Sequence, residues 1–355
     1  MKLAGLLTVF LALLIYPETA LNAAREAMQA WYTSVAPALF PFMALMPMLT
    51  CPASLRTWER MAGRWMRPVF GLPGSAAPAV FISMIAGSPA GAAAAAQVCA
   101  NQGELERIVC CCGLSPAFLV TGIGAAMLND VRFGYTLLIA QLLSQLTLLL
   151  LTRCAPAGES LRNDFRPPQT DPIRAAVLSI LGVCGYMMLF SVLAALLRRI
   201  FRNETVGLAL LCLLDAPSGT RAVAVSSIII ERKRLILAAV AGFGGLCIAL
   251  QNLSACGGRV KLWRYLSAKA CSAALTAAFS ALLTDRRMIS EGKVVPAMEI
   301  STLAAVILIV PTLFSWEKPH FLTKEILKKQ PQFRRKTAEN HNIRYKIRTL
   351  AYNIL

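Results

Sequence analysis

The stretch Ala86-Gly87-Ser88-Pro89-Ala90-Gly91 interrupts a long apolar segment and decides how the fold is interpreted. A second interruption, Asp215-Ala216-Pro217-Ser218-Gly219, divides another apolar segment in the same way. The apolar residues on either side of each interruption are too few for a comfortable membrane span, which needs about 20 residues. Interrupted apolar segments in corresponding positions of two halves are typical of transporters that bind their solute at the breaks.

The composition of the chain indicates a membrane protein. Of its 355 residues, 57% are hydrophobic and 15% are charged, whereas a soluble domain carries roughly a quarter charged residues. Uncharged runs at 133–152, 175–197 and 235–258 have about the length that crosses a hydrocarbon core of ~30 Å. The net charge of +18 comes from short loops and the C-terminal tail. Such basic loops contact anionic lipids, so we predict membrane lipids as partners and no nucleic acid.

Residue types needed for covalent or metal chemistry are scarce. Both histidines, His320 and His341, lie in the polar tail, which excludes an intramembrane histidine relay, a zinc site and a Ser-His-Asp triad. The eleven cysteines are irregularly spaced and mostly apolar in context, so we interpret them as small packing residues. The sequence also has no nucleotide-binding loop. We therefore predict no enzyme, no cofactor and no metal site.

The order of apolar segments repeats along the chain. Helices are expected at 3–16 and 27–55, followed by an arginine-rich loop and a re-entrant helical hairpin within 68–103. Spans follow at 107–128, interrupted by Gly113-Leu114-Ser115-Pro116, at 133–152 and at 175–197. The second hairpin is expected at 205–230, and further spans at 235–255, interrupted by Gly242-Phe243-Gly244-Gly245, at 263–284 and at 296–315.

Three crossings lie between the two hairpins in this scheme. An odd number makes the hairpins enter from opposite faces, which is the geometry of an inverted repeat. The predicted fold class is an all-α polytopic membrane protein with about eight transmembrane helices plus two re-entrant helical hairpins. Two alternatives stay open: both hairpins span, giving ten helices, or residues 3–16 are a cleaved signal segment rather than a short first helix.

Asp215 is the strongest candidate for a functional side chain. It directly follows the apolar run Leu210–Leu214, and a carboxylate at membrane depth is a functional hypothesis by default. It could bind a coupling ion, exchange a proton or orient a solute group. The alternative is a helix cap, in which the carboxylate accepts the free N–H groups of the next half-helix. The sequence weighs these roles about evenly, and one residue can serve both.

Polar residues at the breaks are candidates for solute contact, because half-helix N-termini direct N–H groups and positive dipole ends at an anion. Arg221 could pair with a solute carboxylate or with Asp215, or lie beside lipid headgroups. Among the amides, ligand contact is favoured for Gln251 and helix joining for Asn252. The predicted solute site consists of Ser88, Gly91, Ser115, Thr121, Asp215, Ser218, Arg221, Gln251 and Asn252.

Several short motifs follow one another over roughly residues 35–285. They are Leu39-Phe40-Pro41-Phe42, Met66-Arg67-Pro68-Val69-Phe70-Gly71-Leu72-Pro73-Gly74, Gly87-Ser88-Pro89-Ala90-Gly91-Ala92, Ser115-Pro116-Ala117-Phe118, and Gly242-Phe243-Gly244-Gly245 with the following Gln251. In order and spacing they resemble the nucleoside-recognition Gate domain proteins, and within them the YlbJ-type sporulation integral membrane proteins. The resemblance implies kinship with concentrative nucleoside transporters, which have re-entrant hairpins in inverted repeats.

The resemblance also implies a division of the chain and a role. It divides the chain into an N-terminal helix and loop (1–32), a first Gate-like repeat (33–152), a polar linker (153–174), a second Gate-like repeat (175–284), a last transmembrane helix (285–315) and a basic cytoplasmic tail (316–355). The implied role is movement of dipicolinic acid into the forespore, in the cell membrane or, more narrowly, the outer forespore membrane.

The leading hypothesis is a membrane permease for a small polar, anionic solute, with dipicolinate or a nucleoside-like molecule as its partner. A coupling ion and a homo-oligomer are further partners that the sequence leaves open. The first alternative is a non-transporting membrane scaffold or regulatory subunit of a sporulation complex, favoured by the departures at Ser88, Ala90 and Ser115 from the family's usual motif residues. The second alternative is a nucleoside transporter.

Overall fold

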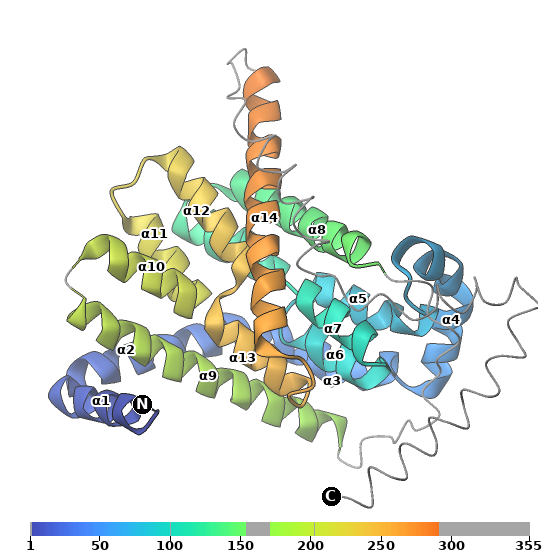
Figure 1. Ribbon diagram of the computed structural model, residues 1–355, viewed down its shortest axis with the longest axis horizontal. Coiled ribbons are helices and arrows are strands. Elements are labelled where there is room, and N and C mark those ends of the chain that lie inside the picture. The colour runs from blue at the N-terminus through green and yellow to red at the C-terminus, as the bar shows by residue number, and fades with distance from the viewer. Residues whose placement is uncertain (1, 100, 154–170, 202, 291–355) are drawn as a thin grey trace, which may run out of the picture. The chain divides into compact units, whose positions relative to one another are not determined.

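The computed structural model describes residues 2–99, 101–153, 171–201 and 203–290. The regular secondary structure of these residues consists of helices, without a strand (Figure 1). The predicted all-α class is therefore confirmed over these residues. The predicted last span at 296–315 and the basic tail lie outside them.

The N-terminal region contains more helix than expected. After α1 (Lys2–Ile15), the helices α2 (Pro17–Ala30), η1 (Trp31–Val35) and α3 (Ala36–Leu49) run as one apolar helix of 33 residues. The loop predicted before residue 33 is helical, because η1 widens to a π-helical turn and the prolines of α3 stay within the helix. Such a wider turn accommodates local strain without ending the helix.

The arginine-rich loop predicted after residue 55 is also wrong. Residues there form α4 (Pro52–Trp65), which continues as η2 (Met66–Phe70). Pro52 starts the helix at its first turn, where the missing N–H costs nothing. Gly71, with φ of 61°, then ends η2, and the chain bends by 98° into η3 (Gly74–Ala76) and α5 (Ala77–Ile85).

Both predicted polar breaks separate pairs of short helices. The first lies between α5 and α6 (Ala90–Val98), and the second between α10 (Glu204–Leu214) and α11 (Ala216–Val225). The two arms of each pair pack against each other. We refer to α5 with α6 as the first hairpin and to α10 with α11 as the second.

Each hairpin is followed by an interrupted helix, as predicted. The first consists of α7 (Gln102–Cys111) and η4 (Phe118–Met127), and the second of α12 (Ile230–Phe243) and α13 (Gly245–Ala255). The interruption at Gly244 has a φ of 80°, a conformation that glycine adopts readily. The long helices α8 (Val131–Leu151), α9 (Pro172–Ile200) and α14 (Leu262–Ser290) are continuous.

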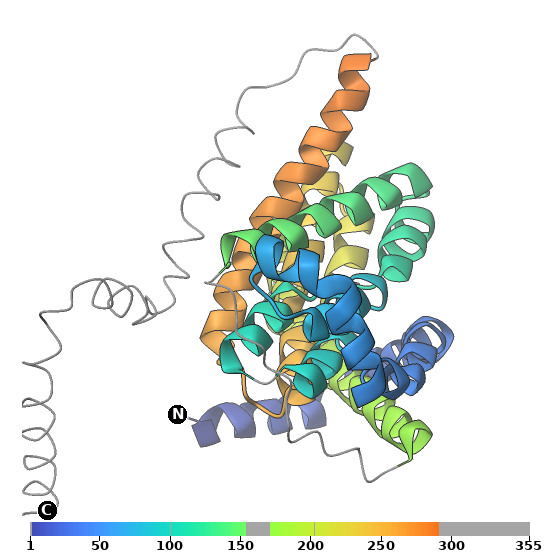
Figure 2. The same ribbon diagram turned by 90° about the vertical axis from the view of Figure 1, so that its right-hand side faces the viewer.

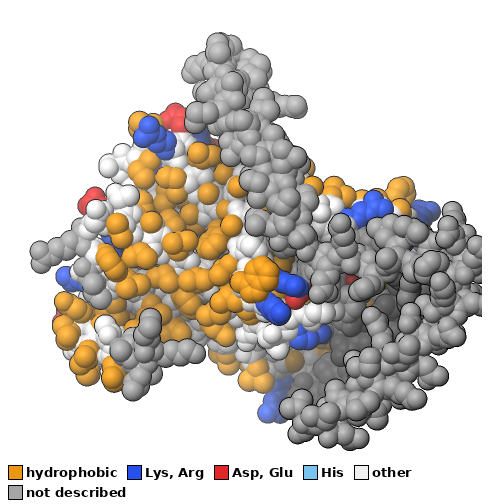
Figure 3. Space-filling view, viewed as in Figure 1, with side chains coloured by type: hydrophobic (Ala, Val, Ile, Leu, Met, Phe, Trp, Pro, Cys, Tyr) orange, Lys and Arg blue, Asp and Glu red, His pale blue; other side chains and the backbone are white. Residues whose placement is uncertain are grey.

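Five helices in the described residues are long and apolar enough to cross a membrane, or six if the bent pair of α4–η2 and η3–α5 is one span. This supports a polytopic membrane protein, while eight spans and the inverted repeat stay predictions. Much of the described surface in Figure 3 is hydrophobic, and its charged side chains occur in small groups. Such a surface suits contact with lipid rather than water.

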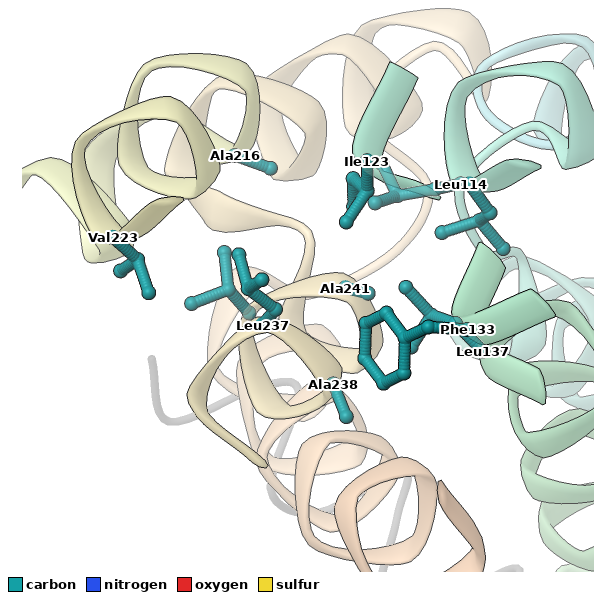
Figure 4. Close-up of a cluster of buried hydrophobic side chains, with 11 residues drawn as sticks. Leu114, Ile123, Phe133, Leu137, Ala216, Val223, Leu237, Ala238 and Ala241 are labelled. Carbon is teal, nitrogen blue, oxygen red and sulfur yellow. The ribbon is translucent and has the colours of Figure 1, made fainter. Parts of the chain in front are cut away.

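The second hairpin shares a core with the first interrupted helix. Leu114 and Ile123 pack against Phe133 and Leu137 of α8. The same cluster contains side chains from α11 and α12 (Figure 4). In addition, α14 packs along α12 and α8, and α2 along α9. Figures 1 and 2 show α14 running beside α8 and α12. Segments from the two halves of the chain are thereby interlocked.

Candidate functional site

The tip of the first hairpin is buried against the break in the following helix. Gly87 has a φ of 73°, and a Cβ there would lie 2.7 Å from the nitrogen of Ser115. The N–H of Ser88 donates to the carbonyl of Gly113 at 2.8 Å. Only glycine combines this close approach with this backbone conformation, so the tip and the break fit each other as a pair.

A polar chain connects this tip to the second half of the molecule. The amide nitrogen of Asn252, on α13, donates to Ser88 Oγ at 2.9 Å and to Tyr265 Oη at 2.7 Å. Asn252 and Tyr265 are both 0% exposed. The amide of Asn252 connects the first hairpin, α13 and α14. Its role in joining helices or in contacting a solute stays a prediction.

The tip of the second hairpin has a corresponding position. Asp215 Oδ2 accepts from the N–H of Ser218 at 3.0 Å and from Ser218 Oγ at 2.6 Å, which caps α11. A Cβ at Gly245, the first residue of α13, would lie 3.1 Å from the nitrogen of Ala216. Each hairpin tip thus packs against the break in the helix that follows it.

A pocket of about 570 Å³ lies beside the second hairpin and includes three of the predicted site residues, Asp215, Ser218 and Arg221. Arg198 and Arg199 from α9 and Glu26 from α2 also line it. Arg221 lies 3.9 Å from Glu26, and the two side chains are 61% and 71% exposed. Arg221 therefore pairs loosely with Glu26 rather than with Asp215.

A second pocket, of about 430 Å³, lies beside the first hairpin. Pro89 and Gln97 line it from this hairpin, Gln251 from α13 and Tyr186 from α9. The amide nitrogen of Gln251 donates to Cys247 Sγ at 3.2 Å. The neighbouring residues Gln251 and Asn252 consequently have different surroundings. Gln251 lines a pocket, whereas Asn252 is bonded to Ser88 and Tyr265 in the protein interior.

The remaining predicted residues do not join either pocket. Ser115 Oγ accepts from the N–H of Phe118 at 3.3 Å and caps the helix after the break. Thr121 is exposed, and its hydroxyl donates to the carbonyl of Ala117. Gly91 lets the two arms of the first hairpin meet, since a Cβ there would lie 2.5 Å from Ser83 Cβ. The structure therefore brings together part of the predicted set.

Sequence reasoning missed a group of buried polar side chains between α8 and α14. Gln141 is bonded to both backbone polar groups of Leu114, and Lys269, which is 2% exposed, donates to the carbonyl of Cys112. Both amide atoms of Gln145 are buried without a hydrogen-bond partner in the described residues. A lone lysine inside an apolar run was the available signal, because such residues are rare in spans.

Three comparisons with known proteins bear on this geometry. The chain is 22% identical over 286 residues to the sporulation integral membrane protein YlbJ of Bacillus subtilis (strain 168), a match that covers 66% of this chain and 70% of the relative. It is a distant similarity. No family model matches the chain. No solved structure matches it either.

The similarity and the apolar helices together support an integral membrane protein that is distantly similar to YlbJ. The resemblance to the wider Gate domain family rests on the sequence motifs described above.

At the start of α7, Glu104 is a buried carboxyl outside the candidate spans, with an exposure of 4%. Burial raises the pKa of Glu104 above its ordinary value of 4.5, while hydrogen bonding to Asn101 and the charge of Arg107 oppose this rise. Asn101 Nδ2 donates to Glu104 Oε1 at 2.9 Å. A carboxyl in this setting keeps its proton to a higher pH in the folded than in the unfolded protein.

We expect the wild-type protein to lose stability relative to Glu104→Gln as the pH rises from 4.5 towards 7. The unfolded carboxyl releases its proton before the folded one does, so rising pH favours the unfolded state. Thermal unfolding of both proteins across this range measures the effect. Glu18→Gln, at an exposed position, is the matched control. A difference between wild type and Glu104→Gln that is constant with pH would contradict the expectation.

Proposed function

We propose that this chain is a membrane permease for a small polar, anionic solute. The observation that carries the proposal is the paired arrangement of hairpin tips and helix breaks, with Ser88 bonded to Gly113 and Gly245 packed against Ala216. Irregular backbone at membrane depth is tolerated where it is buried in protein or lines a wet cavity. Two such breaks in corresponding positions favour an inverted repeat with alternating access around them.

The pocket beside the second hairpin supports an anionic solute. Arg198, Arg199 and Arg221 contribute three positive charges to its lining, against Glu26 and Asp215. Asp215 already accepts two hydrogen bonds from Ser218, so its charge is partly engaged in capping α11. Guanidinium groups bind carboxylates through paired, charge-assisted hydrogen bonds. A small dicarboxylate fits this chemistry better than a neutral nucleoside.

The relative is named a sporulation integral membrane protein. We extend a role in spore formation to this chain, with dipicolinate as the solute to be tested first. The favoured location is the cell membrane of the sporulating cell, and more narrowly the outer forespore membrane.

Uptake into proteoliposomes tests the permease. Purified protein is reconstituted, and the accumulation of labelled dipicolinate is compared with that of labelled uridine and with protein-free liposomes. We expect uptake of dipicolinate that unlabelled dipicolinate inhibits. Uptake of uridine alone would favour a nucleoside transporter. A folded, reconstituted protein that moves neither solute would favour a membrane scaffold.

Arg221→Gln is expected to raise the half-saturating dipicolinate concentration about tenfold or more, because a hydrogen bond to a charged group contributes about 1.5–3 kcal/mol. The same assay in proteoliposomes measures this change. Arg232→Gln removes one positive charge at an exposed position of α12 that does not line the pocket, and it is the matched control. Equal half-saturating concentrations in the two variants would contradict a role for Arg221 in binding the anion.

A further inference from the structure

Lys269 is a buried cation that the proposed solute site does not use. It lies on α14 inside a candidate span and is 2% exposed. Its amine donates to the carbonyl of Cys112, and its nitrogen lies 5.8 Å from the centre of the Tyr265 ring. No acidic side chain of the described residues is paired with it. A buried ammonium is costly unless nearby acceptors replace its water shell.

The acceptor of Lys269 has a distinctive place in the fold. Cys112 directly follows α7 and is its C-terminal cap residue. The C-terminal end of a helix carries exposed carbonyls and a partial negative charge. In transporters with interrupted helices, such half-helix ends and unwound carbonyls coordinate coupling cations. Lys269 therefore brings a positive charge to a position suited to a cation.

The polar side chains next to Tyr265 and next to the break after α7 carry neutral oxygen atoms rather than carboxylates. Tyr265 Oη accepts from Asn252, and Asn252 Oδ1 is buried without a hydrogen-bond partner in the described residues. Gln145 Oε1 is likewise buried and unpartnered, and Gln145 lies against Gly113, the residue after Cys112. Neutral carbonyl and hydroxyl oxygens are hard ligands of the kind that alkali cations prefer.

The ionisable groups around Lys269 are thiols and a phenol rather than carboxylates. They are the thiols of Cys110 and Cys111 on α7, the thiol of Cys112 just after it, and the phenol of Tyr265 on α14. Glu106, further along α7, is paired with Arg264 at 2.7 Å. Among the residues that the structure describes, Lys269 thus brings a positive charge to this break from the chain itself.

We propose that Lys269 is a tethered cation occupying a monovalent-cation site at the C-terminal end of α7. Its ammonium takes the position and the charge that a dissociable ion such as sodium would otherwise provide. The site needs no added alkali cation while Lys269 is present, and it becomes able to bind one when the side chain is removed. If the chain is the permease proposed above, its uptake of solute should need no sodium gradient, because Lys269 already supplies the cation.

Cation-dependent thermal unfolding of the purified full chain tests the proposal. The unfolding midpoint is measured in sodium, potassium and choline chloride at equal ionic strength. We expect equal midpoints for the wild type in all three salts. Lys269→Ala is expected to unfold at a lower temperature in choline chloride and to regain stability, in a saturable way, with added sodium or potassium. A cation-selective rise in the wild type, or none in Lys269→Ala, would overturn the proposal.

Two further variants sharpen the result. Lys261→Ala removes an exposed lysine just before α14 and should behave as the wild type does. Lys269→Met removes the charge but fills the space, so no cation response is expected. If Lys269→Ala cannot be purified in choline chloride, its yield is compared with that in sodium and potassium chloride. A higher yield in sodium or potassium chloride supports the site, and equal failure in all three salts contradicts it. These measurements need no transport, so a protein without uptake activity would still test them.

Discussion

Replacing Arg107 with methionine is expected to lower the free energy of unfolding by about 3 kcal/mol or more, because each buried acceptor that loses its donor costs about 1–3 kcal/mol. Arg107 is 3% exposed, and its guanidinium donates to the carbonyls of Phe70, Gly71 and Leu149. These carbonyls lie at the C-terminal ends of η2 and α8, where a positive charge is favourable. One side chain therefore holds α7, η2 and α8 together.

The midpoint of thermal unfolding in detergent measures this loss. Arg132→Met makes the same change at an exposed position of α8 and should leave the midpoint unchanged. Arg107→Lys keeps the charge but loses the planar fork, so an intermediate midpoint is expected. Equal midpoints for Arg107→Met and Arg132→Met would show that the buried contacts contribute nothing measurable.

Gly91→Ala is expected to force apart the arms of the first hairpin, although it adds a single methyl group. A Cβ at this position would lie 2.6 Å from Ser83 Cα, and backbone atoms cannot move aside as a flexible side chain can. Overpacking of this kind typically costs about 1–3 kcal/mol. Gly219 has the equivalent place in the second hairpin, 2.6 Å from Cys212 Cα when a Cβ is added. We expect Gly219→Ala to destabilise the protein similarly.

Gly185→Ala is the matched control for both hairpin variants. An added Cβ at this exposed position of α9 meets no atom within 4 Å. Alanine favours a helix over glycine by about 0.5–1 kcal/mol, so this variant should unfold at the same or a higher temperature. Thermal unfolding and dipicolinate uptake are measured on all three. Hairpin variants that match Gly185→Ala in both assays would mean that the arms are not tightly packed.

The helix breaks could be predicted from sequence because their signals are local. Glycine and proline at 87–91, 113–116, 217–219 and 242–245 disrupt helical geometry wherever they occur. Both hairpins also have a proline followed two residues later by a glycine, in Pro89-Ala90-Gly91 and in Pro217-Ser218-Gly219. These signals do not fix the length of the helices on either side of a break. The observed ends of the hairpin helices therefore differ from the predicted ends by a few residues.

The error over residues 56–67 had a recognisable cause. The charge of this segment suggests a loop, because it contains four arginines, Arg56, Arg60, Arg64 and Arg67. Their spacing of four, four and three residues places them on one face of a helix, which is the observed α4 continued by η2. Periodicity was the better guide here than composition.

The site was harder to predict because its contacts join distant segments. Asp215 and Ser218 were found together, since capping acts over three residues. Lys269 meets Cys112 across 157 positions, and no local pattern indicates which carbonyl a lone lysine will reach. Thr121 is a predicted site residue, yet its side chain is exposed. Whether a side chain is buried or exposed depends on how the helices pack, and this packing cannot be inferred from a single sequence.

The bond between Asn252 and Ser88 has a consequence for how the protein is made. The two residues are 164 positions apart, which corresponds to about 10 to 30 s of synthesis on the ribosome. Throughout that interval the first hairpin has been translated while the helix that supplies its amide donor does not yet exist. A ribosome-bound chain ending before α13 would carry an incomplete joint at Ser88. The first hairpin therefore completes this contact only after the second half of the chain has been made.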